Sequence, residues 1–234
     1  KRLLLISNST NVGEAYLEYT RPHIKSFLGT EVKKVLFVPY AGVSLSYDEY
    51  TNKVKTVFNE LGYDLSSSHE ADDPHQAVRE AEAIIVGGGN TFHLFHVLHE
   101  TGLMHAIRER VMQGTPFIGW SAGSNVACPS LKTTNDMPII MPASFDGMNL
   151  ISFQINPHYT DMQVPNHGGE TREQRIREFL VLNPEMVIVG LKEGTMLKVE
   201  NGDISYIGQK TVKVFRKDEP TLEFDKNANL DFLL

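Results

Sequence analysis

The sequence FIGWSAG at residues 117–123 places a short apolar run directly before a turn of glycine, serine and other small residues. Its last five residues match G-x-S-x-G, a pattern typical of a nucleophile elbow where a strand passes into a helix. There a tight turn strains the backbone of the serine, here Ser121, and lifts its hydroxyl clear of the sheet. The N–H of Ala122 would point into the same space and is a candidate oxyanion donor. A glycine-rich loop without chemistry fits the same letters, but the position after FIGW favours a nucleophile.

Short apolar runs and longer amphipathic segments alternate on both sides of this elbow. We predict strands over residues 3–7, 35–39, 63–67, 83–86, 116–118, 153–156, 186–191, 196–199, 204–207 and 212–215. We predict helices over residues 15–27, 47–61, 74–82, 91–99, 102–112 and 170–182. The alternation predicts parallel βαβ units with helices on both faces of the sheet, and the turn Asn201-Gly202 predicts an antiparallel hairpin at its edge. The fold class is therefore α/β, a three-layer sandwich with a mostly parallel sheet. Residues 1–234 are expected to form one domain, since no linker or repeat interrupts them.

The composition narrows the possible partners. Hydrophobic residues make up 41% of the 234 residues and charged residues 22%, the balance of a globular protein. Lys and Arg number 22 against 29 Asp and Glu, so the net charge of −7 disfavours nucleic acid as a partner. A single cysteine, Cys128, excludes an intrachain disulfide and favours a cytoplasmic location. No apolar run approaches the ~20 residues that span a bilayer, so no membrane partner is expected.

A second glycine-rich turn, VGGGNT at residues 86–91, also joins a predicted strand to a predicted helix. Its spacing fits neither a dinucleotide fingerprint nor a P-loop, so a nucleotide cofactor is poorly supported. The N–H of Gly88 or Gly89 could supply a second oxyanion donor, because loops at the carboxyl ends of parallel strands meet at one edge of the sheet. Alternatively, Asn90 or Thr91 could act as an ordinary helix N-cap.

Nine histidines are candidates for the general base that a serine nucleophile needs. His158 follows a predicted strand in the sequence QINPH, and a strand end is a rigid mount for a side chain. His167, in the glycine-rich segment NHGG, is its rival. The run H-x-x-H-x-x-H at residues 93–99 resembles a metal site, but its third histidine drifts off the helix face and no further ligand is placed. We therefore predict no metal.

Two carboxylates could orient the histidine. Asp136 lies in the loop TTNDMP, and its short side chain is the usual choice for this role. Glu193 follows the predicted strand 186–191, so it would lie at a strand end beside the other site residues. Spacing alone leaves both open.

The segments GGGNT, GWSAGSN, TTNDMP, INPH and GETREQRI occur in one order over most of the chain. Together they closely resemble the peptidase E family, serine peptidases related to cyanophycinase. This resemblance implies a fold like that of class I glutamine amidotransferases (flavodoxin-like) and metal-free hydrolysis of Asp-X dipeptides. It implies Ser121 as nucleophile, His158 as base and, as the acid, Asp136 first or Glu193. Amidotransferases carry a cysteine at the elbow, and the serine here excludes that thiol mechanism. The family also makes a homodimer plausible, with the hairpin edge as one possible interface.

An N-terminal aspartate would bring an extra carboxylate into the site. Arginine commonly binds a carboxylate through two parallel hydrogen bonds from its guanidinium. Arg172 and Arg175 lie at a glycine-rich helix entry, where the helix N-terminus adds favourable potential for an anion. Arg177 is instead expected to form an i,i+4 ion pair with Glu173 on the same helix. Asn90 is a further candidate ligand for the substrate. The prediction is a locally positive cleft on a negatively charged protein.

Overall fold

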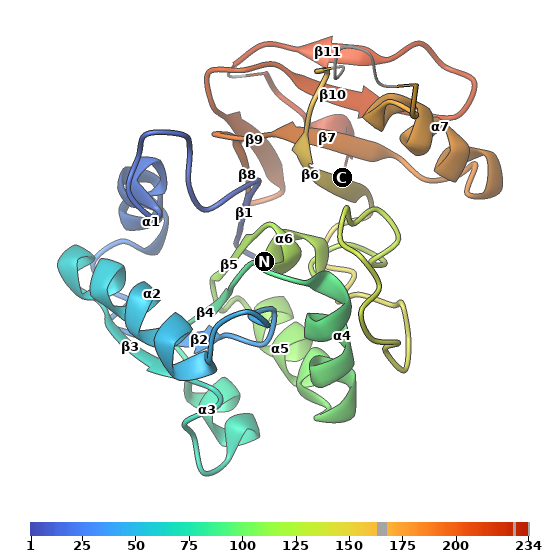
Figure 1. Cartoon of the computed structure of the whole chain (residues 1–234). Helices are drawn as coiled ribbons and strands as arrows, with labels where there is room; N and C mark the ends of the chain where they lie inside the picture. The colour runs from blue at the N-terminus through green and yellow to red at the C-terminus, as the bar shows by residue number, and fades with distance from the viewer. Residues whose placement is uncertain (163–167, 227, 234) are drawn as a thin grey trace.

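A large sheet forms the centre of the fold in the computed structural model, which describes residues 1–162, 168–226 and 228–233 (Figure 1). Its seven strands follow the order β3-β2-β4-β5-β1-β8-β9. The first five strands pair in parallel, and β8 pairs antiparallel with β1 and with β9. The bounds are β1 Leu3–Ile6, β2 Lys34–Val38, β3 Asp64–Ser67, β4 Ala83–Val86, β5 Phe117–Trp120, β8 Met196–Glu200 and β9 Asp203–Ile207. The α/β class, the mostly parallel sheet and the antiparallel hairpin edge are confirmed.

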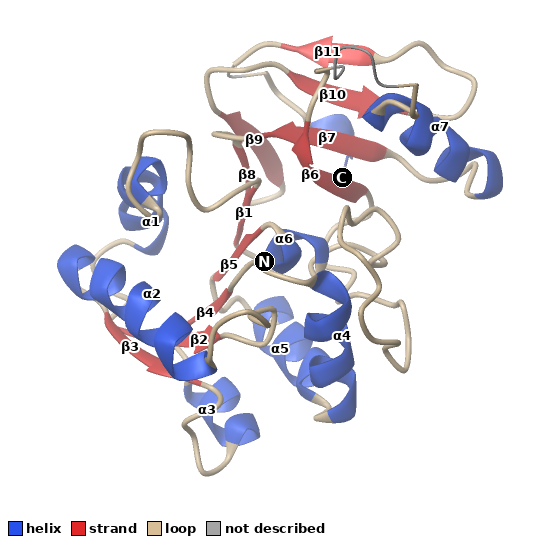
Figure 2. Ribbon diagram, viewed as in Figure 1, coloured by secondary structure: helices blue, strands red, loops and turns tan. Residues whose placement is uncertain are grey.

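Helices cover both faces of this sheet (Figure 2). Alternate residues of a strand point to opposite faces. Accordingly, Leu4 and Ile6 join the buried cluster under α1 and α2, while Leu3 and Leu5 join the cluster under the helices of the other face. The bounds are α1 Arg21–Leu28, α2 Tyr47–Leu61, α3 Pro74–Glu80, α4 Thr91–Glu100, α5 Leu103–Met112 and α6 Ala122–Asn125. The three layers of the predicted sandwich are therefore present.

The first helix begins later than the sequence pattern predicted. A 3-10 turn, η1, occupies Glu18–Thr20, and α1 starts only at Arg21, with Pro22 in its first turn. Proline has no N–H to donate and is tolerated in the first turn alone, so the predicted helix over residues 15–27 could not run through it.

A second sheet lies beside the first, and it was not predicted from the sequence. It has the order β11-β10-β7-β6, with β6 and β7 parallel and the other pairs antiparallel. Helix α7 packs on it through Ile176 and Leu180. The bounds are β6 Gln154–Tyr159, β7 Ile188–Lys192, β10 Val212–Phe215, β11 Leu222–Phe224, α7 Arg172–Leu182 and a final 3-10 turn η2 Asp231–Leu233. Periodicity locates strands but does not say which strands pair, and the mostly exposed β11 has no buried apolar pattern to reveal it.

The two sheets share one apolar core. Ile155 of β6 and Val189 of β7 belong to the same buried cluster as Leu3 and Leu5 of β1. The carboxyl ends of β1 and β5 therefore lie beside those of β6 and β7, which is where the candidate site residues gather. Within the described ranges, no helix is both long and apolar enough to cross a membrane.

Candidate active site

Ser121 occupies a strained turn between β5 and α6. Its backbone angles are φ 53° and ψ −113°, in a region that residues other than glycine rarely adopt. Its N–H donates to the carbonyl of Ile6 at 3.0 Å, which ties the turn to β1. A Cβ added to Gly119 would lie 2.1 Å from the Gly123 carbonyl oxygen, and one added to Gly123 would lie 2.1 Å from that of Val86. The glycines of G-x-S-x-G are therefore required by close backbone packing, as the elbow pattern predicted.

His158 lies opposite this serine, near the end of β6. Its Nε2 is 3.0 Å from the Oγ of Ser121. The pairing of β6 with β7 shifts register here, and His158 itself has a positive φ of 54°. Its N–H donates to the Oγ of Ser7 at 2.9 Å, and that hydroxyl donates to the carbonyl of Leu191 at 2.7 Å. The irregularity turns the imidazole toward the elbow and a buried hydroxyl holds it there. His167, the rival, lies outside the described residues.

Glu193 is the carboxylate beside this histidine. Its Oε1 is 2.7 Å from the Nδ1 of His158, and it follows β7 as the sequence placed it. The next residue, Gly194, donates its N–H to the Oδ1 of Asn8 at 2.8 Å, which fixes the turn. With Nδ1–H donating to Glu193, Nε2 is free to accept the hydroxyl proton of Ser121.

Asp136, the first choice for this carboxylate, lies elsewhere. Its Oδ2 accepts hydrogen bonds from the N–H and hydroxyl of Thr91, at 2.7 and 2.6 Å, and from the hydroxyl of Thr134 at 3.1 Å. The first amides of a helix lack partners and attract negative charge, so the loop TTNDMP folds onto the start of α4. The preference for Asp136 over Glu193 as the partner of His158 is corrected accordingly.

The two glycine-rich turns meet at Ser121, as expected. A Cβ on Gly88 would lie 3.0 Å from the Cβ of Ser121. Gly89 has a φ of 141°, and a Cβ there would lie 2.1 Å from the carbonyl oxygen of Ala41, so only glycine fits. Ala122 is the first residue of α6, a position whose N–H has no partner inside the helix. Of the two candidate oxyanion donors, Gly89 lines the cavity at Ser121, and Ala122 directly follows that serine.

Asn90 is the N-cap of α4, one of the two roles that the sequence left open. Its Oδ1 accepts from the N–H of His93 at 3.1 Å and its Nδ2 donates to the carbonyl of Met137 at 2.9 Å. The residue also lines the cavity at Ser121, so the cap lies within reach of a bound ligand.

Arg172, the first residue of α7, is linked to the strand that carries the base, but neither it nor Arg175 is among the described residues that line the cavity at Ser121. The Nη1 of Arg172 donates to the Oδ1 of Asn135, whose Nδ2 in turn donates to the carbonyl of Pro157 at 2.6 Å. Burial lowers the pKa of the Arg172 guanidinium, and the charge of Arg175 lowers it further. Arg175 itself is largely exposed, with its Nε 3.8 Å from the Oε2 of Glu170.

Arg177 has the structural role predicted for it. Its Nη2 lies 3.4 Å from the Oε1 of Glu173, one helical turn away. Its Nη1 donates to the carbonyls of Arg216 and Glu219, so this guanidinium ties α7 to the segment after β10.

The cavity at Ser121 has a volume of about 620 Å³, within the usual range for small-ligand sites. Its lining includes several residues that the sequence had singled out: Ser121, His158, Gly88, Gly89 and Asp136. Lys53 of α2 also lines the cavity, and it was not predicted from the sequence. Ser7 and Asn8 were missed as well. Their signal was available: they are polar residues directly after a buried strand, at the edge of the sheet where the other loops were expected to meet.

Histidines away from this cavity have other partners. In the run at residues 93–99, His93 Nδ1 is 2.7 Å from the carbonyl of Tyr40, and His99 Nε2 is 3.0 Å from that of Asp146. These contacts fit a packing role.

Burial raises the pKa of the Cys128 thiol to about 12, so this cysteine is a poor nucleophile.

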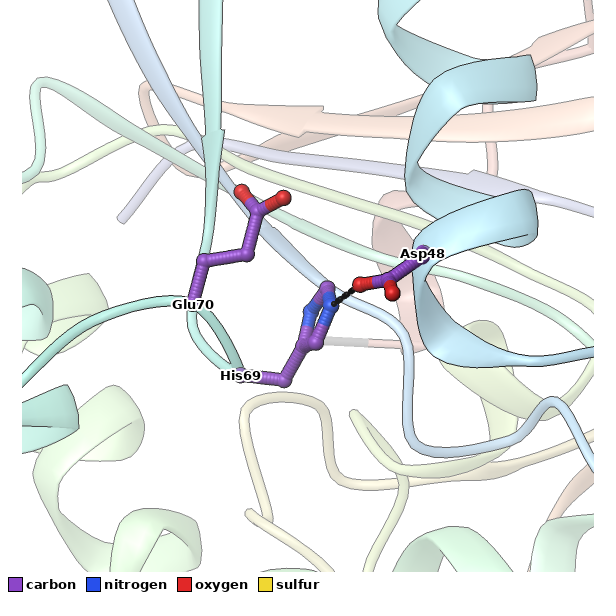
Figure 3. Close-up of side chains that lie close together, drawn as sticks. All are labelled: Asp48, His69 and Glu70. Carbon is purple, nitrogen blue, oxygen red and sulfur yellow. Dashed lines mark hydrogen bonds and ion pairs between the residues drawn. The ribbon is translucent and has the colours of Figure 1, made fainter.

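One further group could offer ligands to a metal ion. Asp48, His69 and Glu70 hold their ligand atoms within 4.8 Å of one another, beside the start of α2 (Figure 3). His69 Nε2 is 2.9 Å from Asp48 Oδ1, and its Nδ1 is 2.6 Å from the Oγ of Ser67. This chain of serine, histidine and aspartate is similar to the one at Ser121 with the roles of the two ring nitrogens exchanged, but Ser67 is only 2% exposed and cannot reach a substrate.

An α/β fold with a serine at a strand–helix elbow, paired through a histidine with a carboxylate, defines proteins equipped to activate a serine hydroxyl. The chain belongs to peptidase family S51, which matches it over residues 3–207.

Relatives and solved structures agree with this family. Peptidase E of Nostoc sp. is 58% identical over 234 residues, covering 100% of this chain and 97% of that protein. Peptidase E of Shewanella amazonensis is 46% identical over 233 residues, covering 100% and 99%. A peptidase structure from an acI-B1 actinobacterium has a TM-score of 0.71 at 19% identity, covering 98% and 96% of the two chains, and therefore supports the fold alone. Family and relatives together support a peptidase.

Proposed function

We propose that this peptidase is a serine dipeptidase that hydrolyses dipeptides with an N-terminal aspartate, without a metal, through an acyl-enzyme on Ser121. The observation that carries the proposal is the continuous contact from Ser121 through His158 to Glu193, with heavy-atom distances of 3.0 and 2.7 Å. The first distance lets the base take the proton of the nucleophile, and the second lets the carboxylate orient the base.

The proposed reaction is acyl transfer. Ser121 attacks the carbonyl carbon of the Asp-X bond while His158 takes the hydroxyl proton at Nε2, and Glu193 stabilises the imidazolium. The N–H groups of Ala122 and Gly89 hold the oxyanion. His158 then protonates the leaving amine, and water cleaves the acyl-enzyme with the same residue acting as base.

For the aspartate side chain, the proposed ligand is Arg172, with Arg175 and Asn90 as further candidates. Support for Arg172 comes from its hydrogen bond to Asn135, which in turn contacts the residue before His158. Support for Arg175 is weaker, because its side chain is 63% exposed. Asn90 already caps α4, so a substrate would share it with the helix.

The first test is a substrate panel of Asp-Leu, Leu-Asp and Glu-Leu, with and without a chelator. We expect hydrolysis of Asp-Leu alone and no effect of the chelator. A preference for β-aspartyl or polymeric aspartyl substrates would favour a different hydrolase of the same family, and no turnover of any of them would favour a binding protein with an inert elbow.

The Ser121→Ala variant tests the mechanism. Turnover should be lost while thermal unfolding stays close to that of the parent protein, because the hydroxyl has no role in the core. Hydrolysis of Asp-Leu by a folded Ser121→Ala variant would rule out the acyl-enzyme.

A cytoplasmic homodimer completes the proposal. The buried single cysteine fits a reducing compartment. Strand β9 lies at an edge of the large sheet, but Leu230 and Asp231 already bond the backbone of Ile204, so the homodimer rests on the family resemblance rather than on a free sheet edge. Sedimentation of the intact protein tests the assembly, and a monomer at micromolar concentration would exclude it.

A further inference from the structure

The cavity at Ser121 contains a cation that the reaction scheme leaves without a role. Lys53 is the one lysine or arginine among the described residues that line it. It lies three positions after Tyr50 on α2, so the two share a helix face, and Tyr50 lines the same cavity. The placement of Lys53 in this lining thus follows from the helix period.

Aromatic rings connect this ammonium to the elbow. Lys53 Nζ lies 4.0 Å from the centre of the Tyr16 ring, and that ring meets the Trp120 ring edge-on at 6.5 Å. Trp120 directly precedes Ser121. The ammonium and the nucleophile therefore line the same cavity, with the rings of Tyr16 and Trp120 in its lining as well.

The lining of this cavity is partly apolar. Val43, Leu45 and Ile139 line the cavity together with the ring of Tyr16. Such a surface suits an aliphatic side chain, and a single positive charge in the same lining suits one carboxylate. In a bound dipeptide, the residue that leaves has both of these features, because its α-carboxylate is the C-terminus.

We infer that Lys53 binds the C-terminal carboxylate of the leaving residue and so selects dipeptides with a free C-terminus. This inference rests on the proposed function. It assigns the two carboxylates of an Asp-X substrate to two different cations, Arg172 on α7 for the side chain and Lys53 on α2 for the C-terminus. A lysine suits the C-terminal carboxylate, because its flexible side chain can move its charge to match leaving residues of different size. The planar guanidinium of arginine suits a carboxylate that is always held in the same position, such as the aspartate side chain.

The experiment compares kcat/KM for Asp-Leu with that for Asp-Leu amide, which lacks the C-terminal charge. We expect the parent enzyme to favour the free acid by about tenfold or more, and Lys53→Gln to reduce that ratio about tenfold. Lys53→Arg keeps the charge and should retain most of the preference. Lys55→Gln is the matched control, since Lys55 lies on the same helix, is absent from this lining and should keep the parent ratio.

A third substrate, Asn-Leu, separates the two cations. Lys53→Gln should leave the ratio of Asp-Leu to Asn-Leu unchanged, whereas Arg172→Gln should reduce it. An unchanged ratio of acid to amide in Lys53→Gln overturns the inference, as does a change confined to the ratio of Asp-Leu to Asn-Leu. If the parent enzyme cleaves none of these substrates, the proposed function itself fails, and this outcome is distinct from a failure of the Lys53 assignment.

Discussion

At the scale of single residues, the contacts divide the two acidic candidates by role. Glu193 faces the imidazole of His158, while Asp136 holds the first turn of α4 through Thr91. The side chain of Glu193 is 46% exposed, so its ion pair with His158 contributes little to the free energy of folding. Its expected role is to orient the imidazole ring and to stabilise the imidazolium.

We therefore expect opposite consequences from two conservative variants. Glu193→Gln should lower kcat by about 10³-fold with little change in KM, as loss of the orienting acid does in other serine enzymes. Asp136→Asn should lower the free energy of unfolding by about 1–2 kcal/mol through weaker hydrogen bonds to the helix start, with a much smaller loss of kcat. Steady-state kinetics and denaturant unfolding measure both, and a larger loss of kcat in Asp136→Asn would reverse the assignment.

At the scale of elements, helix α6 packs so closely against the end of β4 that only glycine fits at position 123. We expect Gly123→Ala to lower the free energy of unfolding by about 3 kcal/mol or more, because its Cβ would lie 2.1 Å from the Val86 carbonyl oxygen. Gly168→Ala is the control, since a Cβ there meets nothing within 4 Å. Urea unfolding of both variants checks the prediction, and equal stability would mean that the elbow can shift without cost.

Within the second sheet, an ionic cluster ties the segment after β6 to the strands β7 and β10. Burial alone would raise the pKa of Asp161, but hydrogen bonds from Lys192 and Lys213 outweigh it and lower that pKa to about 2. A carboxyl with a lowered pKa stabilises the folded state above its unfolded pKa, near 4, and loses this effect as the pH falls toward 2. Asp161→Asn should therefore melt at a lower temperature than the parent protein at pH 7, with the difference vanishing between about pH 4 and pH 2. A difference that persists at pH 2 would contradict the assignment.

The same scale shows what a sequence can predict. The helix over Tyr47–Leu61 and the strands at Ala83–Val86 and Val212–Phe215 were predicted to the residue, because local periodicity and end signals determine them. Ser121 and His158 were predicted for a similar reason, since each follows or ends a strand. For the partner of His158 the sequence offered both Asp136 and Glu193 and put Asp136 first, because the choice depends on how two separate sheets meet, which no local pattern encodes.

At the scale of the whole molecule, the candidate site exists only where the two sheets touch. Ser121 belongs to the large sheet, whereas His158 and Glu193 belong to strands or turns of the second. Net charge is also a poor guide at this scale: the chain carries −7, yet the described lining of the cavity holds one lysine, Lys53, and one carboxylate, Asp136. The predicted gathering of Arg172 and Arg175 in this cleft is not seen among the described lining residues. The few groups inside a cavity, rather than the total, govern what binds there.

Ser7 is the residue that joins the two sheets at this point. It follows β1 of the large sheet, is fully buried, accepts from the N–H of His158 and donates to the carbonyl of Leu191 in β7. In Ser7→Ala both groups of the second sheet lose their partner, so we expect the free energy of unfolding to fall by about 1–3 kcal/mol. Because the imidazole would also lose its fixed position, kcat should fall more than KM rises, and the pH profile of kcat should shift. Ser7→Cys, which keeps a weak donor and acceptor, should recover part of the loss. If Ser7→Ala lowered stability but left kcat and its pH profile unchanged, the contact would serve the fold alone, and the position of His158 would be set by β6 and Glu193 without it.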